Sequence, residues 1–133
     1  MATTRGYRNN NPLNIRKNDD VFQGEVIPSK DKAFKEFKTM AYGYRAGFVV
    51  LRTYFNNYHL DTIRKLITRF APADDNNHTE NYIKAVSERS GKGADESIRY
   101  DKETMVPIVA AMSFVENGKE PDMADVNQAW SML

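Results

Sequence analysis

The chain has 133 residues, of which 41% are hydrophobic and 28% are charged, a balance typical of one soluble globular domain spanning residues 1–133. The 19 Lys and Arg against 18 Asp and Glu argue against nucleic-acid binding, which needs a concentrated basic face. The lack of Cys excludes disulfides and thiolate zinc sites, and His59 and His78 are not spaced as a ligand pair. We therefore expect no metal and no cofactor.

We expect neither a membrane span nor an export signal. No run of about 18 apolar residues occurs, which argues against a membrane-spanning helix. The first residues, MATTRGYRNNN, lack the apolar stretch of a secretory signal peptide. The protein is thus expected to be made in the cytoplasm and to need another route if it works elsewhere.

Residues 5–18, RGYRNNNPLNIRKN, are rich in turn-forming residues, and Pro12 favours an extended backbone at Asn11. We expect a loop here. The side chains of Asn10 and Asn11 each offer donors and an acceptor, so they can either tie the loop together or contact the amides and hydroxyls of a sugar. Arg16 in this basic segment is either a solvated residue or a contact to an anionic polymer. The sequence leaves these roles open.

Residues 21–37 are predicted to form a small β-hairpin. Two short extended segments, VFQGEVI and KAFKEF, flank a turn at residues 28–31. Among the acidic residues of the hairpin, Glu25 beside Gly24 is the candidate for a second carboxylate near a catalytic acid. Most acids in such a hairpin are solvated.

The following segments show the spacing of three and four residues that is typical of amphipathic helices. We expect helices over about residues 40–56, from a cap at Asp61, from residues 77–80 to Gly91, and after Asp122. Residues 91–100, GKGADESIRY, have the composition of a flexible linker. Together with the hairpin, these segments predict an α+β fold that is mainly α.

Residues 101–118, DKETMVPIVAAMSFVENG, are predicted to form an apolar helix that carries one carboxylate at its end. The stop signal Asn117-Gly118 directly follows Glu116. A carboxylate there feels the negative end of the helix dipole and partial desolvation, and both raise its pKa. A general acid needs such a pKa, although a Glu before a glycine cap is usually only a solvated residue.

Several segments of the chain resemble elements of the lysozyme-like superfamily. NNPLNIR at residues 10–16, FQGE at 22–25 and AFKEF at 33–37 are similar to segments of its glucosaminidases. TENYIKAV at residues 79–86 is similar to an element of lytic transglycosylases, and VPIVAAMSFVENG resembles the helix that ends in their catalytic glutamate. The resemblance implies a lysozyme-like helical domain with Glu116 as the catalytic acid.

The order of these segments differs from that of the known enzymes, in which the glutamate helix precedes the asparagine-rich segment. A circular permutation, with residues 91–100 as the new join and a break between the glutamate helix and Asn9, would reconcile the two orders. The chain from about residue 5 to 120 also resembles small phage and prophage proteins that are virion-associated or lysozyme-like. Phe22 and Phe70 stand where those proteins have Trp.

The resemblance implies cleavage of the β-1,4 glycosidic bond of peptidoglycan without a cofactor. Glu116 is then the general acid and base, and Glu25 is the weaker candidate for a second acid. Tyr82 is either a hydrogen-bond donor near the acid or a core tyrosine. The residues that we predict to bind the glycan are Asn10, Asn11, Arg16, Asn81 and Tyr82.

Two other functions remain open on the sequence. The chain is alternatively a non-catalytic lysozyme-like module that binds glycan or builds part of a virion. It is also compatible with an effector that a phage-like or secretion apparatus carries to a cell wall, which implies an immunity or inhibitor protein. A lytic protein of either kind acts at the cell wall or in the periplasm after delivery, or from the virion. The sequence does not distinguish hydrolysis from formation of a 1,6-anhydro product.

Overall fold

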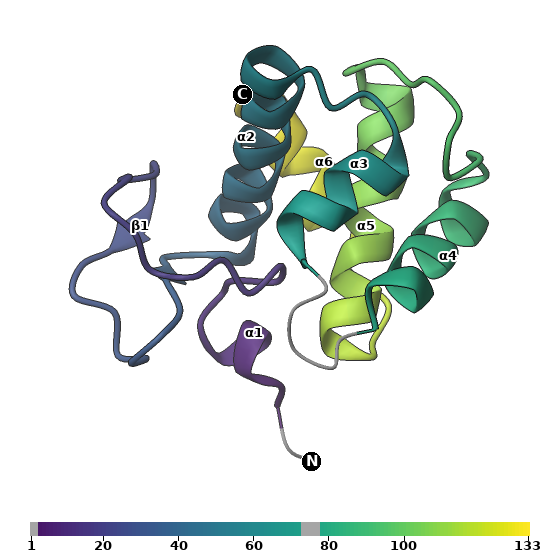
Figure 1. The fold of residues 1–133 in the computed structure, drawn as a ribbon. Coiled ribbons are helices and arrows are strands. Elements are labelled where there is room, and N and C mark those ends of the chain that lie inside the picture. Colours follow the sequence, from purple (N-terminus) through teal and green to yellow (C-terminus); the bar gives the residue numbers. More distant parts are fainter. Residues whose placement is uncertain (1–2, 73–77) are drawn as a thin grey trace.

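The computed structural model describes residues 3–72 and 78–133, and Figure 1 shows their arrangement. The predicted mainly α fold with one small sheet is confirmed. In chain order the elements are α1 (Arg5–Arg8), β1 (Glu25–Val26), β2 (Glu36–Phe37), α2 (Met40–Tyr58), α3 (Ile63–Phe70), α4 (Thr79–Ser90), α5 (Lys102–Asn117) and α6 (Met123–Ser131).

Helix α5 lies at the centre of the fold, with α4 on one side and α2 and α6 on the other (Figure 1). Its apolar stripe is fully buried, because Met105, Ile108 and Met112 each have 0% of their surface exposed. Asp101 caps the start of the helix by accepting a hydrogen bond from the Thr104 backbone N–H at 2.9 Å. The buried stripe and the cap therefore fix the position of α5, including its last turn.

The predicted hairpin is confirmed, although its strands are shorter than expected. β1 and β2 pair antiparallel, with Glu25 opposite Phe37 and Val26 opposite Glu36. An isolated bridge between Arg16 and Phe34 ties the amino-terminal loop to the hairpin. The loop and the hairpin thus form one unit beside α2.

The helices begin and end at capping residues, and these positions differ from the ends of the apolar pattern in the sequence. The helix expected over about residues 40–56 is α2, and the side chain of Thr39 caps its start. The helix runs two residues further than expected, to Tyr58, and is capped at its end by His59, which has a left-handed backbone. The predicted cap at Asp61 is wrong, because the hydroxyl of Thr62 accepts the hydrogen bond from the Lys65 N–H. The predicted helix start at residues 77–80 lies partly outside the described residues, and the helix that follows is α4, Thr79–Ser90.

The interpretation of residues 91–100 as a linker is wrong, because this segment packs into the fold. Ile98 is only 7% exposed, and its N–H donates to the Asp61 carbonyl at 2.8 Å. The hydroxyl of Tyr100 donates to the Phe48 carbonyl at 2.8 Å. A few spaced apolar side chains thus anchor a stretch whose composition otherwise resembles a loop.

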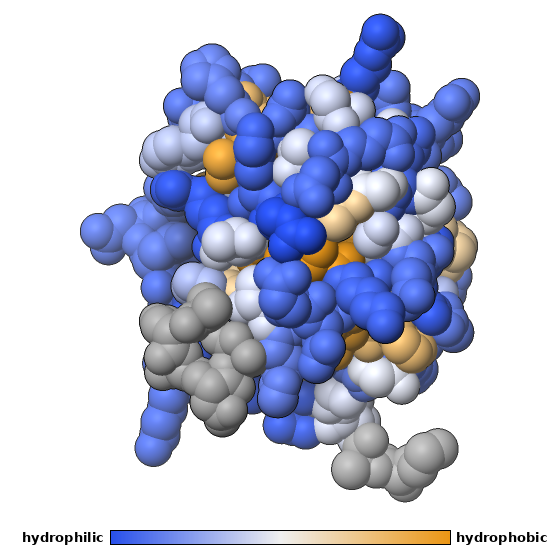
Figure 2. All heavy atoms as spheres, turned by 45° about the vertical axis from the view of Figure 1, so that its right-hand side comes forward, coloured by the Kyte–Doolittle hydropathy of each residue, from blue (hydrophilic) through white to orange (hydrophobic). Residues whose placement is uncertain are grey.

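The surface is largely hydrophilic. Figure 2 shows one face, on which hydrophobic side chains appear only in small patches between polar ones. In the part of the chain that the structure describes, no helix is both long enough and apolar enough to cross a bilayer.

Gly43 lies where the amino-terminal loop crosses α2, and a side chain at this position has no room. A Cβ on Gly43 would lie 2.0 Å from the Asn10 carbonyl oxygen and 2.7 Å from Cδ of Pro12. We expect Gly43→Ala to lower the free energy of unfolding by about 3 kcal/mol, because a backbone segment must move, and urea denaturation measures this loss.

Gly47 on the same helix provides the matched control. A Cβ there would meet the flexible end of Leu13, with Cδ2 at 2.8 Å. Gly47→Ala is expected to change the free energy of unfolding by less than about 1 kcal/mol, because Ala also favours the helix. Equal losses in the two variants would contradict this account of the crossing.

Candidate active site

Glu116 lies half-buried in the last turn of α5, just before the left-handed Gly118 that ends the helix. Two side chains that are far apart in the sequence hold its carboxylate. The Asn14 Nδ2 donates to Oε1 at 2.9 Å, and the Tyr82 hydroxyl donates to Oε2 at 3.0 Å. The carboxylate therefore joins the amino-terminal loop, α4 and α5 at one point.

Burial raises the pKa of Glu116 above its ordinary value, although the hydrogen bonds from Asn14 and Tyr82 act in the opposite direction. Burial and the nearby Glu116 also raise the pKa of Tyr82 well above its ordinary value. Tyr82 therefore keeps its proton. Its hydroxyl can donate to ionised Glu116 and can accept from protonated Glu116.

Asn14 is not among the residues that the sequence predicts for the site, although its neighbours Asn10 and Asn11 are. It lies between the buried Leu13 and Ile15, and its backbone has the left-handed φ of 53° that Asn tolerates better than most residues. This backbone turns the side chain toward Glu116. The Oδ1 of Asn14 is buried and makes no hydrogen bond to any described residue. The asparagine-rich loop was thus the correct segment, but the contributing residue is a later one.

A cavity of about 910 Å³ opens beside Glu116. Its walls come from residues 13–18, Phe34, two residues of α2, residues 70–72 and Glu116 itself. Glu116 contributes the only carboxylate to this lining among the described residues. The size lies in the range of ligand-binding clefts.

The cavity combines aromatic and basic side chains. The aromatic walls are Phe34, Tyr54 and Phe70. The predicted binding residue Arg16 also lines the cavity, and its guanidinium lies 4.9 Å from the centre of the Phe34 ring. Aromatic faces beside hydrogen-bonding groups are typical of sites that accept a sugar ring.

Asn10 and Asn81 do not line this cavity. The Nδ2 of Asn10 donates to the carbonyls of Phe37 and Lys38, at 3.1 and 3.3 Å, so this side chain ties the loop to the hairpin. Asn81 is exposed on α4, beside the buried Tyr82. The structure therefore brings only Tyr82 and Arg16, of the predicted binding residues, to the site of Glu116.

The prediction that Asn11 binds glycan is wrong, because its side chain is fully buried. Its Nδ2 donates to the carbonyls of Ile15 and Lys35, both at 2.9 Å, and its Oδ1 accepts from the Ile15 N–H at 2.9 Å. Asn11 thus supplies the hydrogen bonds that a β-strand would otherwise make, and it holds the loop in shape.

The prediction of Glu25 as a second catalytic acid is also wrong. Its carboxylate forms a buried ion pair with Lys35 at 3.0 Å, and the two side chains are 7% and 1% exposed. It also accepts a hydrogen bond from the Phe22 N–H at 3.1 Å, and it does not line the cavity beside Glu116. A buried carboxylate paired in this way is held within the hairpin and is not free to react.

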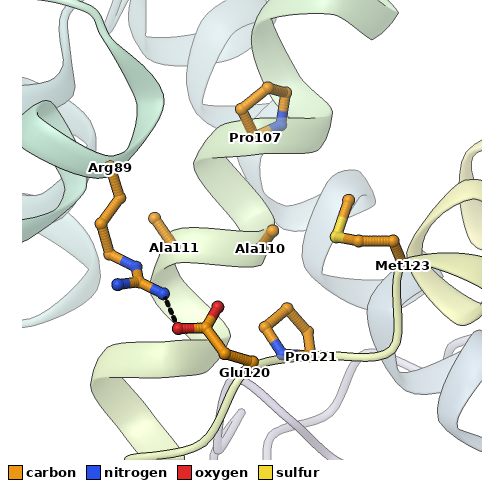
Figure 3. A pocket seen from close by; sticks show the side chains of 7 residues that line it. All are labelled: Arg89, Pro107, Ala110, Ala111, Glu120, Pro121 and Met123. Atoms are coloured by element: carbon orange, nitrogen blue, oxygen red, sulfur yellow. Dashed lines mark hydrogen bonds and ion pairs between the residues drawn. The ribbon is translucent and has the colours of Figure 1, made fainter.

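Figure 3 shows a separate and smaller cavity of about 400 Å³ along α5. Pro107, Ala110 and Ala111 form much of its wall, and Arg89 and Glu120 pair with each other at its edge. Its charged groups neutralise one another, so this cavity lacks the isolated carboxyl group that distinguishes the site of Glu116.

Comparison with known proteins gives one informative relationship. No family model matches the chain. The chain is 42% identical over 120 residues to "Protein P5" of Pseudoalteromonas phage PM2, an alignment that covers 88% of this chain and 73% of the phage protein. That name states no activity.

Removing the Asn14 amide should raise the pKa of Glu116 further. Asn14→Ala deletes a hydrogen bond that favours the ionised carboxylate. An NMR titration of the labelled carboxyl carbon measures the pKa. The exposed Asn81 provides the control, since Asn81→Ala should leave the pKa of Glu116 unchanged. A pKa that falls or stays constant in Asn14→Ala would contradict the proposed contact.

The raised pKa also makes stability depend on pH in a defined direction. Folded Glu116 holds its proton above the ordinary pKa of 4.5, so the folded state binds more protons than the unfolded state. The free energy of unfolding should therefore fall, relative to that of Glu116→Gln, as the pH rises from 4.5 through the folded pKa.

Each unit by which the pKa of Glu116 is raised on folding corresponds to about 1.4 kcal/mol in the difference between the free energies of unfolding of the wild type and Glu116→Gln. Urea denaturation of both proteins across this pH range measures it. A difference that stays constant with pH, or that grows in favour of the wild type, would show that Glu116 is not desolvated.

Proposed function

The chain belongs to the same family as Protein P5 of Pseudoalteromonas phage PM2, and from this premise and the geometry around Glu116 we propose that it cleaves the β-1,4 glycosidic bond of peptidoglycan. The observation that carries the proposal is one carboxyl group of raised pKa that lines a cavity with aromatic walls. The earlier resemblance to lysozyme-like enzymes points to the same residue.

In the first step protonated Glu116 donates its proton to the oxygen of the glycosidic bond. The bond between this oxygen and the anomeric carbon breaks, and its electron pair stays on the oxygen of the leaving sugar. Burial keeps a fraction of Glu116 protonated at a pH where an exposed glutamate is ionised. Asn14 and Tyr82 hold the carboxyl group in one orientation during this transfer.

A second group must stabilise the positive charge that develops on the anomeric carbon. No other carboxylate of the described residues lines the cavity, and Glu25 is paired with Lys35. We assign this role to the acetamido group of the sugar itself, whose carbonyl oxygen bonds to the anomeric carbon. This substrate assistance accounts for a site with one acid.

In the second step the Glu116 carboxylate acts as a base. It takes a proton either from a water molecule that attacks the anomeric carbon or from the C6 hydroxyl of the same sugar. Water gives a reducing end, and the C6 hydroxyl gives a 1,6-anhydro end. The acetamido oxygen leaves the anomeric carbon in both cases, and Glu116 regains its proton.

The contacts of Asn117 support the proposed circular permutation. Its Nδ2 donates to the Pro12 carbonyl at 2.8 Å, and its Oδ1 accepts from the Thr4 hydroxyl at 2.8 Å. The end of the glutamate helix and the start of the asparagine-rich loop are thus adjacent in space. A chain that ran directly from one to the other would restore the order of lysozyme-like enzymes.

The relationship to a phage protein supports a place for this activity in infection. A phage must open the cell wall during entry or release, and an enzyme carried by the virion or made in the host meets this need. We therefore propose that the substrate is the peptidoglycan of the host cell wall. We propose that a protein partner of this chain belongs to the virion.

Glu116→Gln tests the function directly. It retains the shape of the side chain but cannot transfer a proton, so the rate at which a suspension of purified peptidoglycan clears should fall by about 100-fold to 10,000-fold. Glu103→Gln is the matched control, because Glu103 is an exposed acid in the first turn of the same helix and should leave clearing unchanged.

Two results would contradict the proposal. Equal clearing by wild type and Glu116→Gln would assign the reaction to another group. Failure of the folded wild type to clear any peptidoglycan would leave a non-catalytic module that binds glycan or builds part of the virion. Mass spectrometry of the released fragments separates reducing ends from 1,6-anhydro ends.

A further inference from the structure

A second cavity, of about 650 Å³, lies next to the cavity beside Glu116. Asn18, Val50 and Tyr54 line both cavities, so the two are neighbours along α2. Each has the size of a site for one small ligand. Together they form a groove that suits an extended or branched ligand.

The second cavity is strongly basic. Arg45 and Arg52 from α2 and Arg69 from α3 line it, and Asp20 is the only acidic residue of its described lining. The chain as a whole has a formal charge of only +1. The positive charge is therefore a local property of this groove, which the overall balance of charges conceals.

Arg69 is held in place by aromatic rings and not by a carboxylate. Its guanidinium carbon lies 3.7 Å from the centre of the Tyr58 ring and 5.2 Å from that of Tyr54. Among the described residues, no carboxylate forms an ion pair with Arg69 or Arg52, and Arg45 donates to the Met132 carbonyl at 3.3 Å. A stacked guanidinium keeps the N–H groups at its edge available for an anion.

We propose that this basic groove binds the carboxylates of the stem peptides that branch from the glycan, so that the substrate is peptide-bearing and not bare glycan. The inference rests on the proposed function, because the glycan must lie beside Glu116 for its side branch to reach Arg52 and Arg69. Guanidinium groups match the planar carboxylate in two parallel hydrogen bonds. Because the two cavities share the walls formed by Asn18, Val50 and Tyr54, a peptide that branches from a glycan beside Glu116 is close to the groove.

Binding to Glu116→Gln tests the inference without cleavage of the probe. Two saccharides of equal length are compared by calorimetry at low and high salt: an N-acetylglucosamine tetramer and a peptidoglycan tetrasaccharide with uncross-linked stem peptides. The peptide-bearing probe should bind about tenfold more tightly at low salt, and high salt should reduce this advantage. A short single-stranded oligonucleotide serves as a third probe.

Arg52→Gln/Arg69→Gln, introduced into Glu116→Gln, should abolish the tenfold advantage and leave binding of the bare tetramer unchanged. Arg99→Gln/Lys102→Gln removes the same charge from exposed positions before and at the start of α5, which do not line the groove, and should preserve the advantage. Circular dichroism establishes that both sets of variants are folded.

The outcomes separate the two proposals. Equal affinity for both saccharides, while the wild type still clears peptidoglycan, would overturn the peptide site and leave the cleavage intact. Loss of saccharide binding together with a wild type that does not clear peptidoglycan would overturn the proposed function and the peptide site with it. Tighter binding of the oligonucleotide, lost in Arg52→Gln/Arg69→Gln, would assign the groove to a phosphate polymer and overturn the inference.

Discussion

The structure depends on a buried carboxylate that two distant parts of the chain hold in place. Asn14 and Tyr82 donate to the two oxygens of Glu116 at 2.9 and 3.0 Å, and the neighbouring Asn117 binds the Pro12 carbonyl. These contacts join the amino-terminal loop and α4 to the end of α5. A half-buried polar group needs such partners, so the contacts also close the fold. Burial raises the pKa of the carboxyl group, and the hydrogen bonds from Asn14 and Tyr82 offset part of this effect.

The amino-terminal segment has a scaffold role that its composition conceals. Asn11 is fully buried and hydrogen-bonds to backbone groups of the loop and the hairpin, while Gly43 lets the loop approach α2 closely. The rigid loop then presents Asn14 to Glu116 and Arg16 to the cavity. Asparagines of one short stretch thus divide between holding the loop and holding the acid, according to which way each side chain points.

The groove along α2 carries a concentrated positive charge that the net charge of the whole chain does not reveal. A chain with almost balanced charges places three arginines around one cavity, because residues of α2 and α3 that are far apart in sequence face the same space. Beside them, the cavity at Glu116 has aromatic walls and one acid. The proposed site for acid chemistry and the proposed site for anions are therefore neighbours along α2.

The sequence by itself determined the mainly α class, the hairpin and the place of Glu116 at a helix end, because these follow from periodicity and from interactions within a few residues. Only the tertiary structure decided that Asn14 and not Asn11 contacts Glu116, that Glu25 pairs with Lys35, and that Ile98 anchors residues 91–100 to the core. Each of these depends on contacts between residues far apart in the chain or on the direction of one side chain, which local patterns do not specify.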